Sequence, residues 1–489
     1  MSYLKILFLA AEAEPLVKVG GLGDVAGSLP QALQRAGNID IRLAIPYYGT
    51  IREKHYPLTT VAVCDVPHHS GAIPAKIFTT KLNDLIVYLV SGDPIPAGSP
   101  VYSADGLRDG YKFTFFSLAA LRLAEAIHWT PDIIHANDWH TAPAIYALDK
   151  QRSPIFAQTS SVLGLHNLPY MGTGAGPAMQ GFGLPPAVES NLPWWAQDMP
   201  LPLGLLSADH IVAASPSYAS EILTPEFGLG LEDFLQSRKS KISGILNGLD
   251  TEKWNPETDK ALPARFTSTS LSGRVTDKVA LLNEIGFAGD QDIPLLSVIS
   301  RLDTQKGIDL IPAALHKIAE LPWRIVFLAT GDPELEAALR RLEVEFPDRV
   351  RALLRFDDAL SRRIYAGADM LLIPSRYEPC GLTQMIAMRY GCVPVARSTG
   401  GLRDTIHDFA TSAKSSGFLF EKPESGELAT ALRRAIDLHQ KQEGWISLQE
   451  RGMAQDFSWE RSTKQYLKLY EQISRQRRRR RSSTGRTPG

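Results

Sequence analysis

The chain has 489 residues, of which 44% are hydrophobic and 21% charged. This composition excludes a collagenous or largely disordered protein and predicts roughly two to four globular domains. Basic residues number 52 and acidic residues 53, but Arg475–Gly489 holds seven arginines and no acid, which leaves the body with a formal charge of −8 and no general affinity for nucleic acid.

The cysteines and the N-terminus indicate where the protein resides. Cys64, Cys380 and Cys392 are far apart and form no CxxC pair, so we expect neither a disulfide framework nor a cysteine zinc site, and a reducing compartment is favoured. The first apolar run is short and is followed by Glu12, unlike a signal peptide, and no apolar run reaches eighteen residues. We therefore predict a cytoplasmic protein that does not enter a membrane.

The first half of the chain repeats one pattern. Short apolar, β-branched runs are each followed by turn residues or a stretch with helical periodicity, which is typical of βαβ units and a parallel sheet. We expect strands at Lys5–Ala10, Ile41–Ile45, Ile86–Val90, Asp132–Ala136, Ser161–Leu165 and His210–Ala214.

The pattern lapses over Thr251–Pro263 and then resumes, which predicts two doubly wound α/β domains with ligands in the crevice at the carboxyl ends of their strands. We set the domains at 1–247 and 248–474, the second closed by a helix over Phe457–Ile473, and we expect the basic tail 475–489 to be disordered. The second set of strands is Pro294–Ser300, Arg324–Ala329, Arg349–Arg355, Asp369–Pro374, Val393–Ala396 and Gly417–Phe420.

The first chemical motif is the glycine-rich stretch Lys18–Val25, which opens a helix. Glycines allow a ligand to approach the backbone closely, and amides at a helix start attract anions, so a phosphate or sugar oxygen would suit Gly20 and Gly21. The stretch also matches a loose dinucleotide fingerprint, but that fingerprint turns directly off its strand, whereas Glu12–Val19 intervenes here. A purely structural glycine turn is the other alternative. Gly-Gly-Leu occurs again at Gly400–Leu402.

Polar residues follow two further strands. His135–His140 ends one strand with the sequence His-Ala-Asn-Asp-Trp-His, and His166 begins a similar cluster after the next strand. Open α/β sheets carry functional groups at such positions. Metal ligation by the histidines is one reading, and capping of the next helix by Asn137 or Asp138 is the commoner one.

Two loops of the second half carry charge after strands. Arg301 and Lys306 lie five residues apart and would clamp a diphosphate, although solvated surface charge is the ordinary alternative. Glu378 follows the strand Asp369–Pro374, and Gly381–Thr383 then opens a helix, so a carboxylate for sugar hydroxyls and amides for phosphate share one loop. The chain has no GxxxxGK[ST] or HExxH motif, and we expect no metal and no cofactor.

Together these motifs resemble those of the bacterial glycogen synthase and plant starch synthase family. The resemblance runs from about Leu4 to Ile473 and rests on six motifs in order, which begin at Lys18, His135, Leu165, Gly244, Ser300 and Pro374. It implies a GT-B fold and an enzyme that transfers glucose from ADP-glucose to the non-reducing end of an α-1,4-glucan, with retention of configuration. UDP-glucose is the less favoured donor, and glycogen or a maltooligosaccharide would be the acceptor.

The resemblance also implies residue roles. Arg301 and Lys306 would stabilise the leaving diphosphate, Glu378 would hold the donor's hydroxyls, and Asp138 and His166 would line the glucosyl pocket. The residues expected to contact substrate are Lys18, Gly20, Gly21, Tyr102, Asn247, Cys380, Gly381, Leu382 and Thr383.

Three positions depart from the family pattern as we expect it. Val19 replaces the commoner threonine, although both occur among starch synthases. Ile386 stands where many related glycosyltransferases have a second glutamate, which glycogen synthases generally lack too, and Phe356 stands where we expect a tyrosine near the adenine. The last difference bears on the choice of nucleotide. A catalytically silent glucan-binding protein would lack a phosphate cation or Glu378, and this chain has both.

Overall fold

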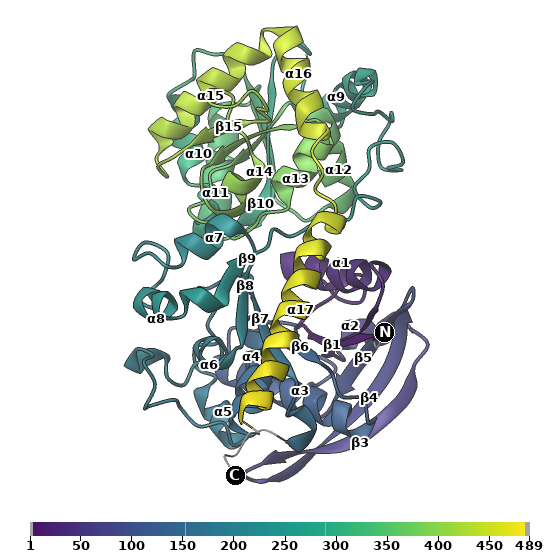
Figure 1. Ribbon diagram of the computed structural model, residues 1–489. Coiled ribbons are helices and arrows are strands. Elements are labelled where there is room, and N and C mark those ends of the chain that lie inside the picture. The colour runs from purple at the N-terminus through teal and green to yellow at the C-terminus, as the bar shows by residue number, and fades with distance from the viewer. Residues whose placement is uncertain (1–2, 152, 289, 485–489) are drawn as a thin grey trace. The chain divides into compact units, whose positions relative to one another are not determined.

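The computed structural model describes residues 3–151, 153–288 and 290–484, and the chain forms two compact units (Figure 1). Unit 1 comprises Met1–Gly248 and Trp459–Gly489, and unit 2 comprises Leu249–Ser458. Each unit contains a mainly or wholly parallel sheet with helices packed on it, so the predicted pair of doubly wound α/β domains is confirmed.

The sheet of unit 1 is parallel except for the pairs β3–β4 and β4–β5. Its strands lie in the order β3-β4-β5-β2-β1-β6-β7-β8-β9. Their bounds are β1 Leu4–Leu9, β2 Ile39–Pro46, β3 Thr59–His68, β4 Gly71–Leu82, β5 Leu85–Ser91, β6 Ile133–Asn137, β7 Ser160–Leu165, β8 His210–Ala213 and β9 Ile242–Gly244.

The helices of unit 1 connect these strands, except for α17, which comes from the end of the chain. They are α1 Gly21–Arg35, α2 Gly49–Glu53, α3 Gly106–Ala126, α4 Asp138–Lys150, α5 Gly176–Gly181, α6 Pro200–Ser207, α7 Pro216–Glu221, α8 Glu232–Ser237 and α17 Trp459–Thr484, with 3-10 turns at Pro154–Phe156, Trp194–Ala196 and Lys239–Lys241.

Unit 2 has a six-stranded parallel sheet in the order β12-β11-β10-β13-β14-β15. Its strands are β10 Leu295–Leu302, β11 Arg324–Gly331, β12 Val350–Leu353, β13 Met370–Ile373, β14 Val393–Arg397 and β15 Phe418–Phe420. Its helices are α9 Ser272–Glu284, α10 Leu310–His316, α11 Pro333–Glu345, α12 Asp358–Gly367, α13 Thr383–Arg389, α14 Gly400–Thr405, α15 Ser425–His439 and α16 Gln442–Met453, with a 3-10 turn at Thr304–Lys306.

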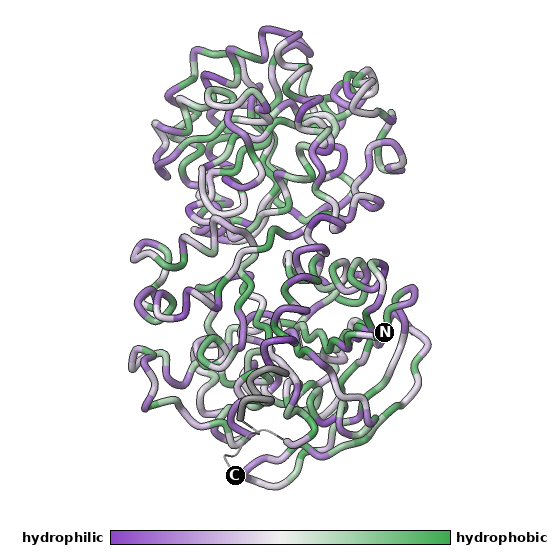
Figure 2. Tube along the Cα trace, viewed as in Figure 1, coloured by the Kyte–Doolittle hydropathy of each residue, from purple (hydrophilic) through white to green (hydrophobic). Residues whose placement is uncertain are grey.

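The core of each unit follows its sheet. Hydrophobic segments run along the central strands, and hydrophilic segments gather on the outer helices (Figure 2). In β1 every residue from Ile6 to Leu9 is buried, because a parallel strand covered on both faces needs apolar side chains on both. Within the described residues, no helix is both long and apolar enough to cross a membrane.

The C-terminal helix differs from its expected place. We assigned Phe457–Ile473 to the second domain, but α17 belongs to unit 1. Its residues Trp459, Tyr466, Tyr470 and Ile473 are buried in the same hydrophobic cluster as β1 and α1. Because the apolar side chains of a terminal helix can cover any exposed face, the sequence shows that α17 must pack but not against which unit.

The expectation of a disordered tail from Arg475 was wrong as far as Thr484, where α17 ends. Arginine is a good helix former, and the stretch contains no glycine or proline before Gly485. Arg475 also lies 3.2 Å from Glu471 one turn earlier, and Arg477 lies 3.7 Å from Asp209. Residues 485–489 of the predicted tail lie outside the described residues.

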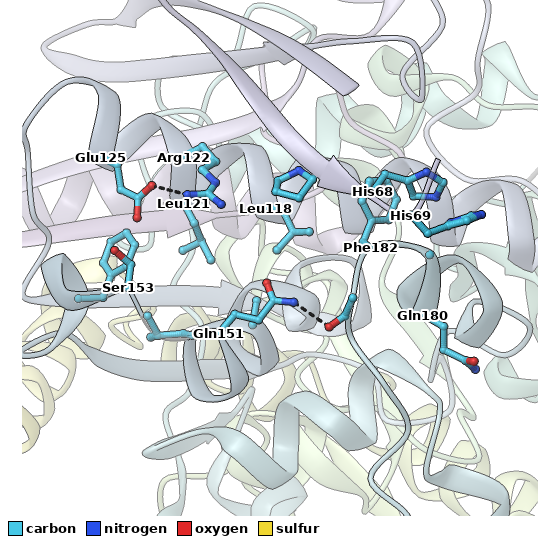
Figure 3. Close-up of a pocket in the computed structure, with 16 residues that line it drawn as sticks. His68, His69, Leu118, Leu121, Arg122, Glu125, Gln151, Ser153, Gln180 and Phe182 are labelled. Carbon is cyan, nitrogen blue, oxygen red and sulfur yellow. Dashed lines mark hydrogen bonds and ion pairs between the residues drawn. The ribbon is translucent and has the colours of Figure 1, made fainter. Parts of the chain in front are cut away.

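A cavity of about 290 Å³ opens in unit 1 beside α3 and α4 (Figure 3). Its floor is apolar, with Leu118, Leu121 and Phe182 buried, and polar groups such as His68 and Gln151 stand at its rim. None of the residues that the sequence predicts for the site lines this cavity. The motifs of unit 1 therefore lie elsewhere in the unit.

Candidate active site

The motifs of unit 1 meet at the carboxyl edge of its sheet. Strands β1, β6 and β7 are parallel neighbours, so the chain leaves all three at the same edge. Glu12 follows β1, Asp138 follows β6 and His166 follows β7. The positional rule used on the sequence thus brings Asp138 and His166 together.

Asp138 forms the junction between β6 and α4. Its backbone has φ = 54°, a left-handed conformation that is unfavourable for an aspartate and is typical of strained functional positions. Its Oδ1 accepts the backbone amides of His166 at 2.7 Å and Asn167 at 3.3 Å. Burial raises the pKa of Asp138 to about 7, although these two amides act in the opposite direction. The Asp138 side chain thus binds the backbone that follows β7 and does not cap α4, contrary to one of the two interpretations of the sequence.

His166 is held by a second contact. Its Nε2 lies 2.9 Å from Oδ1 of Asn137, and the Asn137 amide donates to the Leu9 carbonyl at 2.8 Å. Asn137 likewise makes no side-chain cap on α4. Burial lowers the pKa of His166 to about 4, so the ring is neutral at pH 7.

The glycine-rich loop is organised by Glu12, a buried carboxylate with 1% exposure. Glu12 accepts the amides of Val19 and Gly20 and the hydroxyl of Tyr102, the last at 2.8 Å. The expected anion-binding amides are therefore partly occupied by a side chain of the protein itself. Burial raises the pKa of Glu12.

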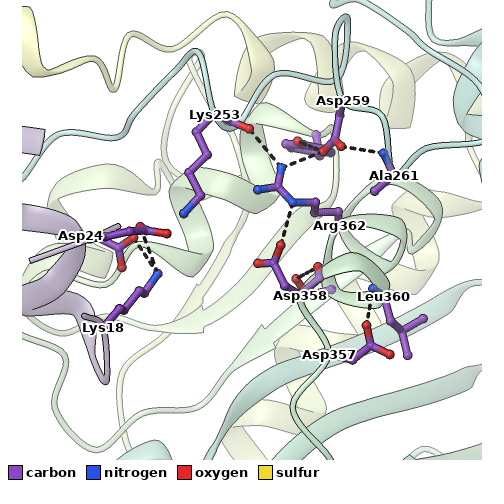
Figure 4. A network of polar contacts seen from close by, with 12 residues as sticks. Lys18, Asp24, Lys253, Asp259, Ala261, Asp357, Asp358, Leu360 and Arg362 are labelled. Atoms are coloured by element: carbon purple, nitrogen blue, oxygen red, sulfur yellow. Dashed lines mark hydrogen bonds and ion pairs between the residues drawn. The ribbon is translucent and has the colours of Figure 1, made fainter. Parts of the chain in front are cut away.

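Lys18 lies in an acidic setting (Figure 4). Its ammonium is 2.7 Å from Asp24 in the first turn of α1 and 3.7 Å from Glu14. Burial raises the pKa of Asp24 to about 6, and Lys18 counteracts this. Lys18 is thus a cation on the loop that a ligand could recruit from Asp24.

Asn247 lies at the end of unit 1, close to the boundary at Gly248. Its side chain is 5% exposed, and its Oδ1 has no hydrogen-bond partner among the described residues. A buried amide oxygen without a donor costs free energy, so a bound donor group would stabilise it.

The histidines of the first polar cluster serve packing. The Nδ1 of His135 lies 2.6 Å from the Tyr470 hydroxyl of α17, and His140 stacks on Trp139 with ring centroids 4.4 Å apart. Burial lowers the pKa of both rings to about 3. No group of three or more His, Cys, Asp or Glu side chains in the described parts of the chain is placed to hold a metal ion.

In unit 2, Lys306 and Glu378 form a close ion pair. The Lys306 ammonium is 2.7 Å from Glu378 Oε2 and 3.0 Å from Oε1, and the Ser375 hydroxyl donates to Oε2 at 2.9 Å. Arg301, at the end of β10, lies 3.3 Å from Asp303, and its side chain is 58% exposed. Both predicted diphosphate cations and the predicted sugar-binding carboxylate thus share one edge of the sheet of unit 2.

The loop after Glu378 is packed against the second Gly-Gly-Leu motif. The amide of Gly401 donates to the Glu378 carbonyl at 3.0 Å. A Cβ at position 401 would lie only 2.0 Å from the Cys380 carbonyl oxygen, so glycine is required there. Gly381 has φ = 72°, which also favours glycine. The motif at Gly400–Leu402 therefore holds the loop Cys380–Thr383 in place.

Two residues differ from what the sequence analysis expected. Phe356, expected near the adenine, is 86% exposed. Glu12 was not predicted as a site residue, although it follows β1 as Glu378 follows β13, so the same positional rule would have found it.

Comparison with known proteins agrees with this architecture. The family description "Starch synthase catalytic domain" matches residues 5–237, and "Glycosyl transferases group 1" matches residues 287–450. The chain is 40% identical to a glycogen synthase of Anaeromyxobacter dehalogenans strain 2CP-C over 96% of this chain and 100% of the relative. It is 37% identical to a glycogen synthase of Syntrophotalea carbinolica over 96% of this chain and 98% of that one.

A solved structure is similar over almost the whole length. The catalytic domain of starch synthase IV from Arabidopsis thaliana, bound to ADP and acarbose, is 34% identical with a TM-score of 0.88 and covers 97% of this chain and 100% of its own. The sucrose-phosphate synthase of Thermosynechococcus elongatus, 18% identical with a TM-score of 0.61, shares the fold over 96% of this chain and 99% of its own. The two α/β units therefore define a glycosyltransferase of the GT-B class. Within that class, the chain belongs to the glycogen synthase and starch synthase family.

Proposed function

We propose that the protein transfers glucose from ADP-glucose to the non-reducing end of an α-1,4-glucan and retains the configuration at the anomeric carbon. Membership of the glycogen synthase family over the whole chain supports this reaction. ADP is the product that such a donor leaves, and the similar Arabidopsis catalytic domain was bound to ADP. UDP-glucose is the less favoured donor.

The observation that carries the proposal is the Lys306–Glu378 pair, which lies at the same edge of the sheet as Arg301. Cleavage of the glycosidic bond develops negative charge on the leaving diphosphate. Fixed cations stabilise that charge more in the transition state than in the ground state, so Arg301 and Lys306 accelerate the step. Glu378 accepts hydrogen bonds from the donor sugar, and the backbone of Cys380, Gly381, Leu382 and Thr383 borders sugar and phosphate.

The site residues of unit 1 complete the proposed set. Lys18, Gly20 and Gly21 bind the donor, and Tyr102 and Asn247 contact the glucosyl unit together with Asp138 and His166. The buried amide oxygen of Asn247 supports a role as an acceptor for a sugar hydroxyl. Because Glu12 occupies the Gly20 amide, Lys18 supplies the positive charge of this loop rather than the amides.

Retention requires either a protein nucleophile or attack from the face of the leaving group. Burial raises the pKa of Asp138 to about 7, which disfavours its anion, and both oxygens of Glu378 are engaged by Lys306. We therefore favour front-face attack, in which an oxygen of the leaving phosphate takes the proton of the acceptor hydroxyl.

None of the three cysteines, all of them in described segments, forms a disulfide, which supports a cytoplasmic site for the reaction.

The test is a transfer assay with purified protein, glycogen or a maltooligosaccharide as primer, and either ADP-glucose or UDP-glucose, each with chelator present. We expect ADP release coupled to chain elongation, faster than UDP release from UDP-glucose. Binding of glucan without release of either nucleotide would instead identify a silent binding protein. An absolute metal requirement would overturn the electrostatic mechanism.

A further inference from the structure

The orientation of the Asn137 amide is determined by a partner that can only accept. Its Nδ2 donates to the carbonyl oxygen of Leu9 at 2.8 Å. A flipped amide would place Oδ1 against that carbonyl, so two acceptors would face each other in a buried site. Asn137 has no measurable exposure, and no water would relieve such a contact. Oδ1 therefore points toward His166.

This orientation determines which nitrogen of His166 carries the proton. Oδ1 of Asn137 lies 2.9 Å from His166 Nε2 and can only accept, so Nε2 must donate. The ring is neutral at pH 7, because burial lowers the pKa of His166 to about 4. A neutral imidazole with a proton on Nε2 has a lone pair on Nδ1, for which the described residues supply no hydrogen-bond partner.

The surrounding backbone leaves the ring little freedom. The His166 amide is held by Asp138 Oδ1 at 2.7 Å. Position 164 on β7 must be glycine, because a Cβ there would lie 2.6 Å from Asn137 Oδ1 and 3.2 Å from His166 Nε2. The ring, the amide and the strand below them thus form one packed unit.

We propose that Asn137 is a positioning residue that locks His166 in the Nε2-protonated tautomer, so that Nδ1 is a permanent hydrogen-bond acceptor for a hydroxyl of the donor sugar. Asn137 acts through His166 and does not itself touch substrate. The assignment of a sugar hydroxyl as the partner of Nδ1 rests on the proposed function, whereas the assignment of the tautomer does not. Toward the substrate His166 is then only an acceptor, and it takes no part in proton transfer.

Nitrogen NMR of the full-length protein labelled with ¹⁵N-histidine tests the tautomer without substrate. The spectrum of a His166→Gln variant assigns the His166 signals. We expect wild-type His166 to show a protonated Nε2 and an unprotonated Nδ1 at neutral pH. Asn137→Ala removes the acceptor and should give a mixture of tautomers. In Asn137→Asp, burial favours a neutral carboxyl, which can donate its proton to the Leu9 carbonyl as the amide does and still present an acceptor to Nε2, so this variant should keep the wild-type tautomer. Asn83→Ala, at an exposed amide that contacts Gln31, is the control and should change nothing.

Kinetics with donor analogues test the role of Nδ1. We expect Asn137→Ala to lower kcat by roughly tenfold, the cost of one misdirected hydrogen bond, with partial rescue in Asn137→Asp. We then compare ADP-glucose analogues that each lack one hydroxyl. The wild-type protein should transfer one of these analogues more slowly than ADP-glucose, and Asn137→Ala should not slow that analogue any further. Both changes would then remove the same hydrogen bond.

Two results would overturn the proposal. One is a protonated Nδ1 in the wild-type protein, and the other is an Asn137→Ala variant whose His166 keeps the wild-type tautomer. If Asn137→Ala does not fold, the wild-type spectrum and the Asp variant still decide the question. A failure of the proposed function can be told apart from a failure of this proposal. In that case no sugar nucleotide would be turned over, but the tautomer of His166 could still be measured.

Discussion

Arg301 and Lys306 have the same predicted role but different surroundings. We therefore expect their alanine variants to lose turnover alike but to differ in stability. Replacing either by alanine should lower kcat by roughly 100- to 1000-fold, as for lost oxyanion donors. Arg301→Ala should leave stability unchanged, because an exposed ion pair is worth little. Lys306→Ala should also destabilise the fold, by about 3 kcal/mol, because it leaves the buried Glu378 carboxylate without its partner.

Steady-state kinetics and urea unfolding measure the two effects. Adding Glu378→Gln to Lys306→Ala should recover stability but not turnover, and exposed Lys317→Ala serves as the control. A rise in KM with unchanged kcat in Arg301→Ala would show uniform binding of the donor instead.

Asp138 makes stability depend on pH. Its pKa of about 7 lies above the ordinary 3.8, so between these values the folded chain binds a proton that the unfolded chain has lost. Stability from this group therefore falls as pH rises from about 4 to about 7 and stays low above that. Asp138→Asn removes the penalty, since its Oδ1 can still accept the His166 amide.

Thermal unfolding across pH measures this dependence. The variant should exceed the wild type in Tm at pH 8, with the difference shrinking toward pH 5, while transfer activity falls. Exposed Asp348→Asn should show no such trend. An equal shift in Tm at both pH values would contradict the assignment.

At the scale of elements, Arg274 joins two helices of unit 2. Its buried guanidinium donates to the carbonyls of Tyr365 and Ala368 at the end of α12 and to that of Tyr390 at the end of α13. Arg274→Met would leave these carbonyls without a donor, and we expect a loss of about 3 kcal/mol or more, measured by urea unfolding. Exposed Arg340→Met is the control, and a loss below about 1 kcal/mol would show that the carbonyls find other donors.

Arg362 anchors the segment that the sequence showed only as a lapse of pattern. It donates to the Lys253 carbonyl and to Asp259 Oδ2, both at 3.0 Å (Figure 4). The Tyr390 hydroxyl donates to the same carboxylate at 2.6 Å. An irregular segment without apolar periodicity is thus held by a few polar contacts to α12 and the end of α13.

The two parts of helix α17 make different contacts. The part up to Ile473 packs in the core of unit 1, and two of the arginines after it form ion pairs. Truncation after Ser474 removes Arg475, whose ion pair with Glu471 is exposed, and Arg477, whose contact with the partly buried Asp209 is long at 3.7 Å, so turnover and Tm should be almost unchanged. Any binding of the protein to polyanions at low salt should disappear, because the arginines supply the only strongly basic segment of the sequence. A several-fold loss of glucan elongation at equal folding by circular dichroism would show that the arginines belong to the working surface.

The sequence predicted elements and site residues that follow one local rule. Glu378, Asp138 and His166 could be located because each follows an apolar strand. The hairpin β3–β4 was missed because β3 is largely exposed and pairs antiparallel with β4, whereas the pattern used was that of a parallel strand followed by a helix. The contact of Glu12 with Tyr102 joins positions 90 residues apart, and the Asn137–His166 contact depends on the order of strands. Long-range pairs such as these are set by topology, which the local pattern does not contain.

On the scale of the whole molecule, the two units differ in whether their residues are contiguous in the sequence. Unit 2 is one continuous segment with its own hydrophobic cluster, whereas unit 1 needs α17 from the far end of the chain. We expect a 249–458 fragment to unfold cooperatively alone, and a 1–248 fragment to remain unstable, because it exposes the cluster that Tyr466, Tyr470 and Ile473 cover.

Co-expression tests this division. A 459–489 segment supplied in trans should restore a soluble, cooperatively folding 1–248 fragment, and the same segment with Tyr466→Ser and Tyr470→Ser should not. A 1–248 fragment that folds stably without any helix supplied would contradict the assignment of α17.

The placement of α17 has a consequence during synthesis. A ribosome releases the residues of unit 1 first, yet the helix that completes its core is among the last segments to emerge. Nascent domains generally fold as they appear, so unit 2 can reach its native state while unit 1 still waits with an uncovered apolar face. For most of its translation the N-terminal unit therefore exposes apolar surface of the kind that chaperones bind. A premature stop between Gly244 and Trp459 yields a protein that has every strand of the larger sheet but lacks the helix that covers its apolar face.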